Sequence, residues 1–479
     1  MENPDPSCPV IAIIGSGASG TLLAWYLRKA GCAARLIVVG DAPEPGRGLA
    51  YGTPCLSHYL NVCASGMSAV TDDPSHFLAW VREHHDPHIS ASDFVPRAIY
   101  GRYLQSLWTE AAPEYHQGHV LACNKAYQEW NLTLADGACI ATSYVVLATG
   151  NFSPVVLADP RRLVPGYSPS AWQDDLYSRI RLDDDVALIG TGLTAVDVLV
   201  RLRQQGHRGQ ITAISRHGWY PTSHAEAPAA GVDDVWFATP PSARAYLALF
   251  RACLRKGISW RSMVNALRAH TNALWGRLPV EEKRRFARHL QRRWDIVRHR
   301  MAPALRSVLD HETEAGTLKI LKGRVEQVFA VSGGVRLSIQ GAERLRCLDV
   351  DHAVNCTGPS RDYRTVGSAL LTGLLETGSA TQTPFGGLVC DDRGALQDAS
   401  GRWSTSLYAI GPMRWGTVFE TTAIPEIRQQ AAELAYHLAA QVQSSSLQNS
   451  LADEVRVPKA ASHISDWPLG KVRRTGCGS

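Results

Sequence analysis

A run of five apolar residues, Val10 to Ile14, ends directly at the sequence Gly15-Ser16-Gly17-Ala18-Ser19-Gly20. An uninterrupted apolar run rich in β-branched residues is typical of a strand that is buried on both faces of a parallel sheet. Residues 21–30 follow with helical spacing and end at Gly31, and residues 35–39 form the next apolar run. The pattern predicts a βαβ unit with a glycine-rich first turn.

The spacing of the three glycines is that of a dinucleotide site. Gly15 permits the tight turn, Gly17 lets the backbone approach the phosphates, and Gly20 lets the helix lie close to the strand. The helix N-terminus that follows binds a pyrophosphate. The motif alone is weak evidence, but the strand, the helix and the next strand are all present, so we predict a nucleotide site here.

The same pattern returns near the middle of the chain. The apolar run of residues 186–189 leads into Gly190-Thr191-Gly192-Leu193-Thr194-Ala195, and a helical and a strand pattern follow. Each glycine turn is followed later by a region of alternating apolar residues that ends in Thr-Gly, at Thr149-Gly150 and at Thr357-Gly358. This internal repeat predicts an α/β fold with two dinucleotide-binding (Rossmann-like) domains, each with a β-meander.

The second strand of each repeat ends differently. In the first repeat, the carboxylate that holds the ribose hydroxyls is expected at the position of Gly40, and Asp41 stands one residue later. Either Asp41 binds the ribose hydroxyls or this contact is missing. In the second repeat the strand ends at Arg216-His217. A guanidinium holds a 2′-phosphate that a carboxylate would repel, which favours NADPH over NADH at the second site.

Three further segments complete the predicted organisation. We expect the first domain to comprise residues 1–160 and 345–440, and the second to comprise residues 180–344 with a helical insertion at about 219–310. Near the C-terminus, a strand and a loop lead into a helix whose N-terminus offers partial positive charge to an electron-rich ring such as a flavin. The serine- and glutamine-rich residues 441–479 predict a disordered tail.

The insertion contains a strongly basic stretch, residues 281–300, with apolar residues at helical spacing on one face. Three interpretations remain open: a solvated helix, which we favour, steering of NADPH or an anionic substrate, and binding of nucleic acid. No nucleic-acid recognition fold accompanies the charge, so a nucleic-acid partner is not expected.

Composition narrows the class of protein. The chain has 479 residues, a formal net charge of +5 and eleven scattered cysteines without a C-x-x-C pair. Reduced thiols in the cytoplasm are expected, with no zinc or other metal site and no redox-active dithiol. No apolar run approaches a membrane span, and the acidic N-terminus is unlike a signal peptide. The oligomeric state is left open.

With both repeats and the C-terminal loop in view, the chain resembles the FAD/NAD(P)-binding flavoproteins that include FAD-dependent urate hydroxylases and aspartate N-monooxygenases. The resemblance rests on residues 46–53, 60–68, 190–197 and 420–428. It implies FAD in the first domain, held by Gly15, Gly17, Ser19, Gly20, Arg47, Tyr51, Asn61, Met67, Val120, Thr149 and Gly150, and covered by Gly411, Thr417, Thr421 and Thr422. The chain departs from the family's pattern at Gly40 and Asp41, where the ribose contact is expected. It implies NADPH in the second domain, held by Gly190, Gly192, Leu193, Thr194, Arg216 and His217, with Thr357 and Gly358 at the domain junction.

The implied activity is that of a monooxygenase. NADPH would reduce FAD, and a C4a-hydroperoxyflavin formed with O2 would transfer one oxygen to a small, electron-rich, anionic substrate. Urate, giving 5-hydroxyisourate in purine catabolism, is the first expectation. The alternatives are N-hydroxylation of an amino acid such as L-aspartate, and an NADPH reductase or redox sensor without oxygen insertion. Residues 167–172 lack the His–Trp signature of Baeyer–Villiger enzymes. Arg414 and Glu420 are expected to position the substrate.

Overall fold

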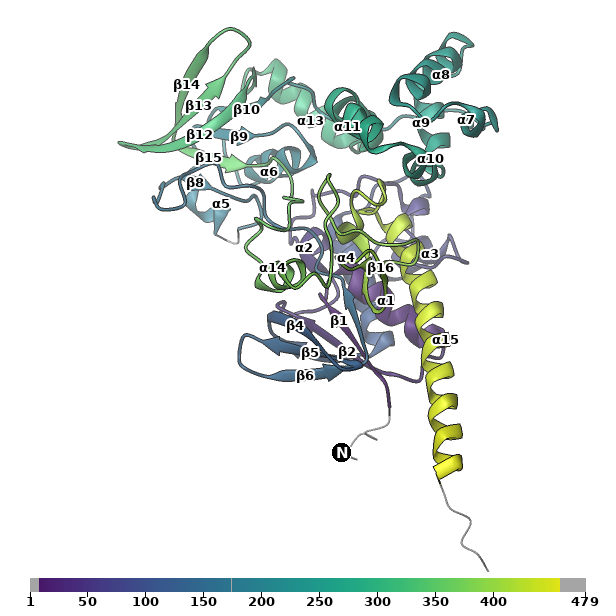
Figure 1. Cartoon of the computed structure of the whole chain (residues 1–479). Coiled ribbons are helices and arrows are strands. Elements are labelled where there is room, and N and C mark those ends of the chain that lie inside the picture. Colours follow the sequence, from purple (N-terminus) through teal and green to yellow (C-terminus); the bar gives the residue numbers. More distant parts are fainter. Residues whose placement is uncertain (1–7, 174, 457–479) are drawn as a thin grey trace, which may run out of the picture.

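The computed structural model describes residues 8–173 and 175–456 and contains two α/β domains and a helical lobe (Figure 1). The first domain is built on a six-stranded sheet in which β1 lies between β2 and β7, and all neighbours are parallel except β16 and β17. In spatial order its strands are β16 (Ala395–Gln397), β17 (Trp403–Ala409), β7 (Tyr144–Leu147), β1 (Val10–Ile14), β2 (Arg35–Gly40) and β3 (Glu114–Gln117).

Helices and a meander cover the two faces of this sheet. On one face α1 (Ala18–Lys29) packs against α4 (Arg97–Ala111) and α15 (Ile424–Arg456), and their apolar side chains form one buried cluster. On the other face the β-meander packs with α14 (Ala369–Glu376). The meander consists of β4 (Val120–Ala126), β5 (Glu129–Leu134) and β6 (Cys139–Thr142). The first domain therefore has the layers that its hydrophobic pattern predicts.

The second domain repeats this plan. Its five-stranded parallel sheet has the order β11 (Leu318–Lys322), β10 (Ile211–Ser215), β9 (Val186–Ile189), β15 (His352–Asn355) and β8 (Tyr167–Ser168). The helices α6 (Leu193–Gln204) and α13 (Pro303–Glu314) belong to it, as does a second meander of β12 (Arg324–Val331), β13 (Gly334–Gln340) and β14 (Leu345–Val350). The strands β7, β1, β2 and β3 correspond to β15, β9, β10 and β11, which confirms the predicted fold class and its internal repeat.

The structure moves one predicted boundary. Strand β14 completes the second meander and β15 pairs with β9, so residues 345–355 belong to the second domain and not to the first. The alternating pattern alone did not show which sheet these strands join, because pairing with a strand far away in the sequence decides it.

The insertion forms a lobe at the upper right of Figure 1. Its basic stretch forms two helices and not one, because the first helix ends and the second begins at Leu290. The helices of the lobe are α7 (Val235–Ala238), α8 (Ala243–Arg255), α9 (Trp260–Arg268), α10 (Thr271–Arg277), α11 (Val280–His289) and α12 (Gln291–Arg298). The short helices α2 (Gly48–Tyr51), α3 (His76–His84) and α5 (Leu176–Arg179) lie in the two α/β domains.

Helix α15 continues to Arg456, so the prediction of a disordered tail from residue 441 is wrong as far as residue 456. Residues 441–456 contain neither glycine nor proline, and their leucine, alanine and glutamine residues favour a helix. The rest of the predicted tail, residues 457–479, lies outside the described residues. Within the described ranges, no helix combines the length and the apolar character that a bilayer span requires.

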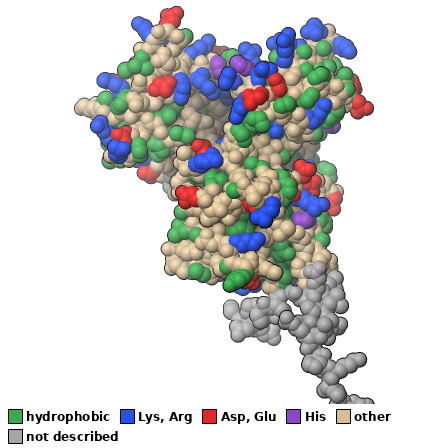
Figure 2. Space-filling model, in the orientation of Figure 1, with side chains coloured by type: hydrophobic (Ala, Val, Ile, Leu, Met, Phe, Trp, Pro, Cys, Tyr) green, Lys and Arg blue, Asp and Glu red, His purple; other side chains and the backbone are tan. Residues whose placement is uncertain are grey.

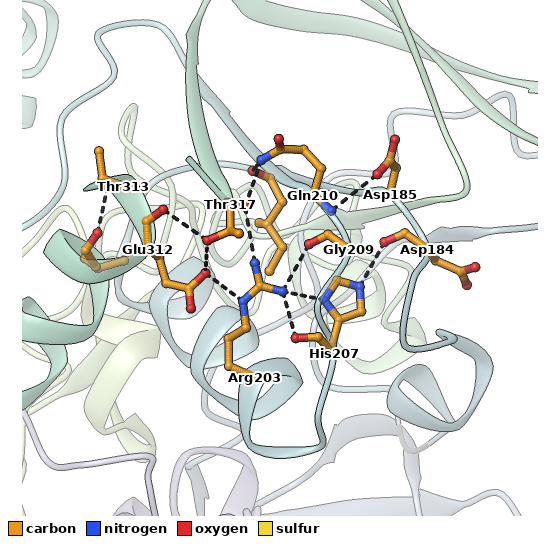
Figure 3. Close-up of polar contacts among 11 residues, drawn as sticks. Asp184, Asp185, Arg203, His207, Gly209, Gln210, Glu312, Thr313 and Thr317 are labelled. Atoms are coloured by element: carbon orange, nitrogen blue, oxygen red, sulfur yellow. Dashed lines mark hydrogen bonds and ion pairs between the residues drawn. The ribbon is translucent and has the colours of Figure 1, made fainter. Parts of the chain in front are cut away.

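Arg203 fixes the end of α6 to the second sheet (Figure 3). Its guanidinium pairs with Glu312 of α13 at 2.7 Å and donates to the carbonyl oxygens of His207, Gly209 and Thr317. It also donates to His207 Nδ1 at 2.7 Å, so the ring proton of His207 is on Nε2, which donates to the Asp184 carbonyl oxygen. Burial lowers the pKa of His207, in agreement with a neutral ring.

Candidate functional site

The first glycine turn lies at the carboxyl end of β1 and is closely packed. Gly15 has φ +118°, and a Cβ there would lie 2.3 Å from the carbonyl oxygen of Ala148. A Cβ at Gly20 would lie 2.0 Å from the carbonyl oxygen of Gly15. Both positions therefore require glycine, and α1 begins directly at the turn with its free N–H groups.

A cavity of about 910 Å³ begins at this turn and extends toward the second domain. Ser19, Val120, Thr149 and Gly150 line its first part, and Thr194 and Gly358 of the second repeat line its far end. The volume lies in the upper part of the range for cofactor sites, and the turn supplies backbone N–H groups for a pyrophosphate. The residues present fit an extended dinucleotide.

Arg47 and Tyr51 lie on the cavity wall, at the two ends of α2. Arg47 Nη2 donates to Gln105 Oε1 at 2.5 Å, whereas the Arg47 Nε, which is buried, has no hydrogen-bond partner within the described chain. A buried guanidinium N–H without a partner is costly, and a phosphate oxygen would satisfy it. Burial raises the pKa of Tyr51 to about 12, so its hydroxyl keeps its proton.

The position of Asp41 has a steric explanation. A Cβ at Gly40 would lie 2.4 Å from Ser16 Oγ and 3.0 Å from the Ser16 backbone nitrogen, so no carboxylate can stand at residue 40. Asp41 is exposed at the cavity wall, and its carboxylate lies 3.1 Å from His119 Nδ1. A ribose contact through Asp41 stays a prediction, and the structure explains why the acid stands one residue late.

The structure places Asn61 and Met67 outside the lining of this cavity. Met67 is buried in the core of the first domain, and its carbonyl oxygen accepts from Tyr100. The carbonyl oxygen of Asn61 accepts from His224 Nε2 at 2.9 Å. Asn61 thus connects the first domain with the start of the helical insertion.

The C-terminal loop lies directly on the first glycine turn. Gly411 has φ +70°, and a Cβ there would lie 2.4 Å from Ser19 Oγ. Thr421 Oγ1 donates to the Gly411 carbonyl oxygen at 2.6 Å, so Thr421 holds the loop in shape. Thr422 lines the cavity, whereas Thr417 bonds to the Leu388 carbonyl oxygen and is absent from the lining. The N-terminus of α15 follows at Ile424.

The second glycine turn has the same geometry as the first. Gly190 has φ +123°, and a Cβ there would lie 2.6 Å from the Cys356 carbonyl oxygen. A Cβ at Gly15 would approach the Ala148 carbonyl oxygen in the same way. The backbone N–H groups of Gly15 and Gly190 donate to Val39 and Ile214, each the penultimate residue of the neighbouring strand. A Cβ added at Gly192 would meet no other atom, and α6 begins at the next residue, Leu193. Thr357, in the second Thr-Gly turn, is exposed, and its hydroxyl bonds to Asn355.

Arginines from the helical insertion reach this second turn. Arg216 and His217 are exposed at the end of β10, and His217 stacks on Trp219 with ring centroids 4.6 Å apart. Arg292 Nη2 donates to the Trp219 carbonyl oxygen at 2.6 Å and to Thr191 Oγ1 at 3.2 Å. Part of the basic stretch therefore adds positive charge to the second nucleotide site, whereas Arg284 pairs with Glu281 on its own helix. The sequence pattern did not predict the partners of Arg292.

Both predicted substrate-positioning residues are buried and have partners. Arg414 is 3% exposed, and its Nη2 donates to the carbonyl oxygens of Asp391 and Asp392, each at 2.9 Å. Glu420 is also 3% exposed and forms a bidentate ion pair with Arg298 of α12, at 2.9 and 3.2 Å. Their roles toward a substrate stay predictions.

A cluster of arginines lies between Asn61 and Glu420, and two of its members, Arg298 and Arg300, come from the basic stretch of residues 281–300. It consists of Arg261, Arg298 and Arg300, grouped around His224. Within the part of the chain that the structure describes, the buried Nε atoms of Arg261 and Arg300 have no hydrogen-bond partner. Burial, together with the three guanidinium groups, lowers the pKa of His224 to about 4. This accumulation of buried positive charge favours an anion.

Two glycine turns at the carboxyl ends of the strands of two sheets define a fold with two dinucleotide-binding domains, and one cavity extends from the first turn to Thr194 and Gly358 of the second repeat. Residues 12–152 match the family model described as FAD-NAD(P)-binding. No curated protein sequence matches the chain significantly.

Solved structures of three enzymes share the fold over nearly their whole length. An ornithine hydroxylase from Pseudomonas aeruginosa is 15% identical, with a TM-score of 0.65 over 91% of this chain and 100% of that chain. An ornithine N-hydroxylase from Kutzneria sp. 744, solved with reduced FAD, NADP+ and L-ornithine, is 13% identical, with a TM-score of 0.67 over 91% and 99%. A cadaverine monooxygenase from Erwinia amylovora, solved with FAD, is 13% identical, with a TM-score of 0.63 over 98% and 100%. At these identities the likeness establishes the fold.

Proposed function

We propose that the protein is an FAD- and NADPH-dependent monooxygenase that hydroxylates the amino nitrogen of a small anionic substrate such as L-aspartate. Bound FAD, reduced by NADPH, would supply the activation of O2. The observation that carries the proposal is the arginine cluster (Arg261, Arg298 and Arg300). Arg298 pairs with Glu420, on the loop whose Thr422 lines the dinucleotide cavity.

The chain's own residues would divide the work as follows. The first glycine turn and Arg47 would bind the FAD phosphates, and the N-terminus of α15 would face the flavin ring with its partial positive charge. Arg216 and Arg292 would hold the phosphates of NADPH at the second turn. Thr421, through its bond to Gly411, would keep the loop in place above the first turn.

The arginine cluster would bind the carboxylates of the substrate. The cluster is connected to both segments that the resemblance assigns to the flavin side. His224, which lies among the arginines, donates to the Asn61 carbonyl oxygen, and Arg298 pairs with Glu420 of the C-terminal loop. In this arrangement Glu420 orients Arg298, and the free Nε groups of Arg261 and Arg300 remain to donate to an anion. The positive charge would bind the carboxylate end and leave the amino end to face the oxidant.

An amine substrate is better supported than urate. The three enzymes compared above act on ornithine or cadaverine, which carry amino groups. Those substrates are cationic at the reacting end. The arginine cluster would favour a substrate that also carries negative charge elsewhere. No observation supports urate.

A substrate panel tests the proposal. The FAD-loaded protein would be assayed with NADPH for O2 consumption and for products by mass spectrometry, with aspartate, glutamate, ornithine, lysine, cadaverine and urate. We expect aspartate or glutamate to stimulate coupled turnover and to gain one oxygen atom on nitrogen. Coupled oxidation of urate, or NADPH turnover with no oxygenated product from any amine, would overturn it.

A further inference from the structure

The helical insertion contains a second cavity, open to solvent on one side and separate from the dinucleotide cavity, with a volume of about 340 Å³. Its walls come from the helices of the lobe, α7 to α12, and are almost entirely apolar. Large side chains such as Phe250, Leu254 and Trp294 line it without filling it. A volume of this size is in the range of small-molecule sites and far above the gaps of a packed core.

Two polar groups of the lining lack a partner. The hydroxyl of Tyr246 and the indole N–H of Trp294 are buried, and neither makes a hydrogen bond within the described residues. Buried donors are almost always satisfied, so two of them on one cavity indicate a missing acceptor. Arg251 and Arg293 also belong to the lining, and both are exposed. Figure 2 shows hydrophobic side chains interspersed with Lys and Arg over this lobe.

We propose that this cavity is a binding site for a small amphipathic carboxylate. Its apolar body would fill the space beside Phe250 and Leu254, and its carboxylate would accept from Tyr246 and Trp294 and lie near the two arginines. The lining favours an anion over a cation, because no acidic residue belongs to it among the described residues.

The occupant of this cavity is distinct from the substrate, because α12 separates the cavity from the arginine cluster that would bind the substrate. Leu290, Arg293, Trp294 and Val297 face the apolar cavity at helical spacing. From the same segment, Arg298 faces Glu420 on the side of the arginine cluster. The cavity also reaches Phe419, next to Glu420, and Trp275, whose indole N–H donates to the Gly416 carbonyl oxygen at 3.1 Å. An occupant therefore contacts the loop that carries Glu420 without entering the charged site.

Calorimetry on the FAD-loaded full-length protein tests the proposal, with decanoate as the probe. We expect one decanoate per chain, bound at least tenfold more tightly than decanol, and no binding of decyltrimethylammonium. Saturating NADP+ should leave the affinity unchanged. The same weak binding by all three amphiphiles, or displacement of decanoate by NADP+, would overturn the proposal.

Variants locate the site. Leu254→Trp fills the cavity and should abolish binding, while Tyr246→Phe removes one donor and should weaken binding about tenfold. Tyr127→Phe, on the fully exposed turn between β4 and β5, is the matched control and should bind as the parent does. FAD content and far-ultraviolet circular dichroism should match the parent in all three.

Two results would contradict this assignment. One is decanoate binding that survives Leu254→Trp. The other is a parent protein that forms a dimer which Leu254→Trp dissociates, since the occupant would then be a second copy of the chain.

Discussion

Arg298 and Glu420 form a buried ion pair that joins the helical insertion to the loop above the first glycine turn. The Arg298 Nε lies 2.9 Å from Glu420 Oε1, the Nη2 lies 3.2 Å from Oε2, and the two side chains are 7% and 4% exposed. Asn272 holds the same loop by accepting from the Glu420 backbone N–H and donating to its carbonyl oxygen. The loop that lies on the first glycine turn is thus fixed by a part of the chain that belongs to neither dinucleotide domain.

Glu420→Gln should destabilise the protein strongly, because it leaves Arg298 buried with a weaker partner, Glu426 at 3.8 Å. Removing one member of a buried pair costs about 3–5 kcal/mol. Urea unfolding followed by tryptophan fluorescence measures the change. The exposed pair Arg336–Asp349 has equally good geometry, at 2.7 Å for both contacts, and supplies the control Asp349→Asn. A similar shift in both variants would contradict a special role for the buried pair.

Gly20→Ala should abolish FAD binding. The added methyl group would lie 2.0 Å from the Gly15 carbonyl oxygen, so α1 must move away from the turn that binds the pyrophosphate. Flavin absorbance after gel filtration measures the bound cofactor. Gly373→Ala, in the middle of α14 with open space around its Cβ, is the control, and it should retain FAD. Full retention of FAD by Gly20→Ala would mean that the first turn does not hold it.

Arg216→Ala should weaken NADPH binding while leaving NADH almost unchanged. A charge-assisted hydrogen bond contributes about 1.5–3 kcal/mol, which corresponds to a roughly 10- to 100-fold rise in KM. Arg292→Ala should weaken both cofactors, because Arg292 lies at the glycine turn and not at the end of β10. Arg346→Ala, on exposed β14, controls for the loss of one positive charge. Equal effects of Arg216→Ala on both cofactors would exclude recognition of the 2′-phosphate.

The parts of the fold that the sequence predicted are those encoded locally. The run from Val10 to Gly20 contains its strand, turn and helix start in one short segment, and its repetition at residues 186–195 reveals the second domain. The same local pattern could not show that Gly40 is excluded as an acidic position, since that depends on Ser16, which lies far from it in the sequence.

The candidate substrate site escaped prediction for a related reason. Arg261 and Arg300 lie on separate segments of the insertion, and His224 brings them to Asn61 of the first domain. In the sequence these arginines are indistinguishable from the solvated arginines around them, such as Arg284. Only the packing of the insertion against the first domain separates a solvated charge from a buried one.

Arg300→Met should raise the KM for the anionic substrate without changing the KM for NADPH. The methionine retains the apolar volume and removes a buried guanidinium whose Nε has no partner among the described groups. We expect a roughly 10- to 100-fold effect, again from the loss of one or two charge-assisted hydrogen bonds. Steady-state kinetics with the best substrate of the panel measure it, with Arg346→Ala as the control. A proportional rise in both KM values would indicate a general structural defect instead of a substrate contact.

His299 should make the protein less stable at acidic pH. Burial, with a smaller contribution from the neighbouring Arg298, Arg361 and Arg268, lowers its pKa to about 3, although Glu426 acts in the opposite direction. The ordinary value of an unfolded histidine is about 6.5, so below that pH the unfolded chain takes up a proton that the folded chain refuses. The free energy of unfolding then falls as the pH decreases from about 6.5 toward 3.

Asp295 acts in the opposite sense, which determines how the experiment is designed. Burial raises its pKa to about 6, so the folded state retains a proton that the unfolded state releases, and this contribution to stability is lost as the pH rises through 6. The useful measurement is therefore the difference in unfolding free energy between the parent and His299→Gln at each pH, in which the contribution of Asp295 largely cancels. We expect the variant to gain stability relative to the parent as the pH falls from 7 to 5. A difference that stays constant over this range would show that His299 does not resist protonation in the folded protein.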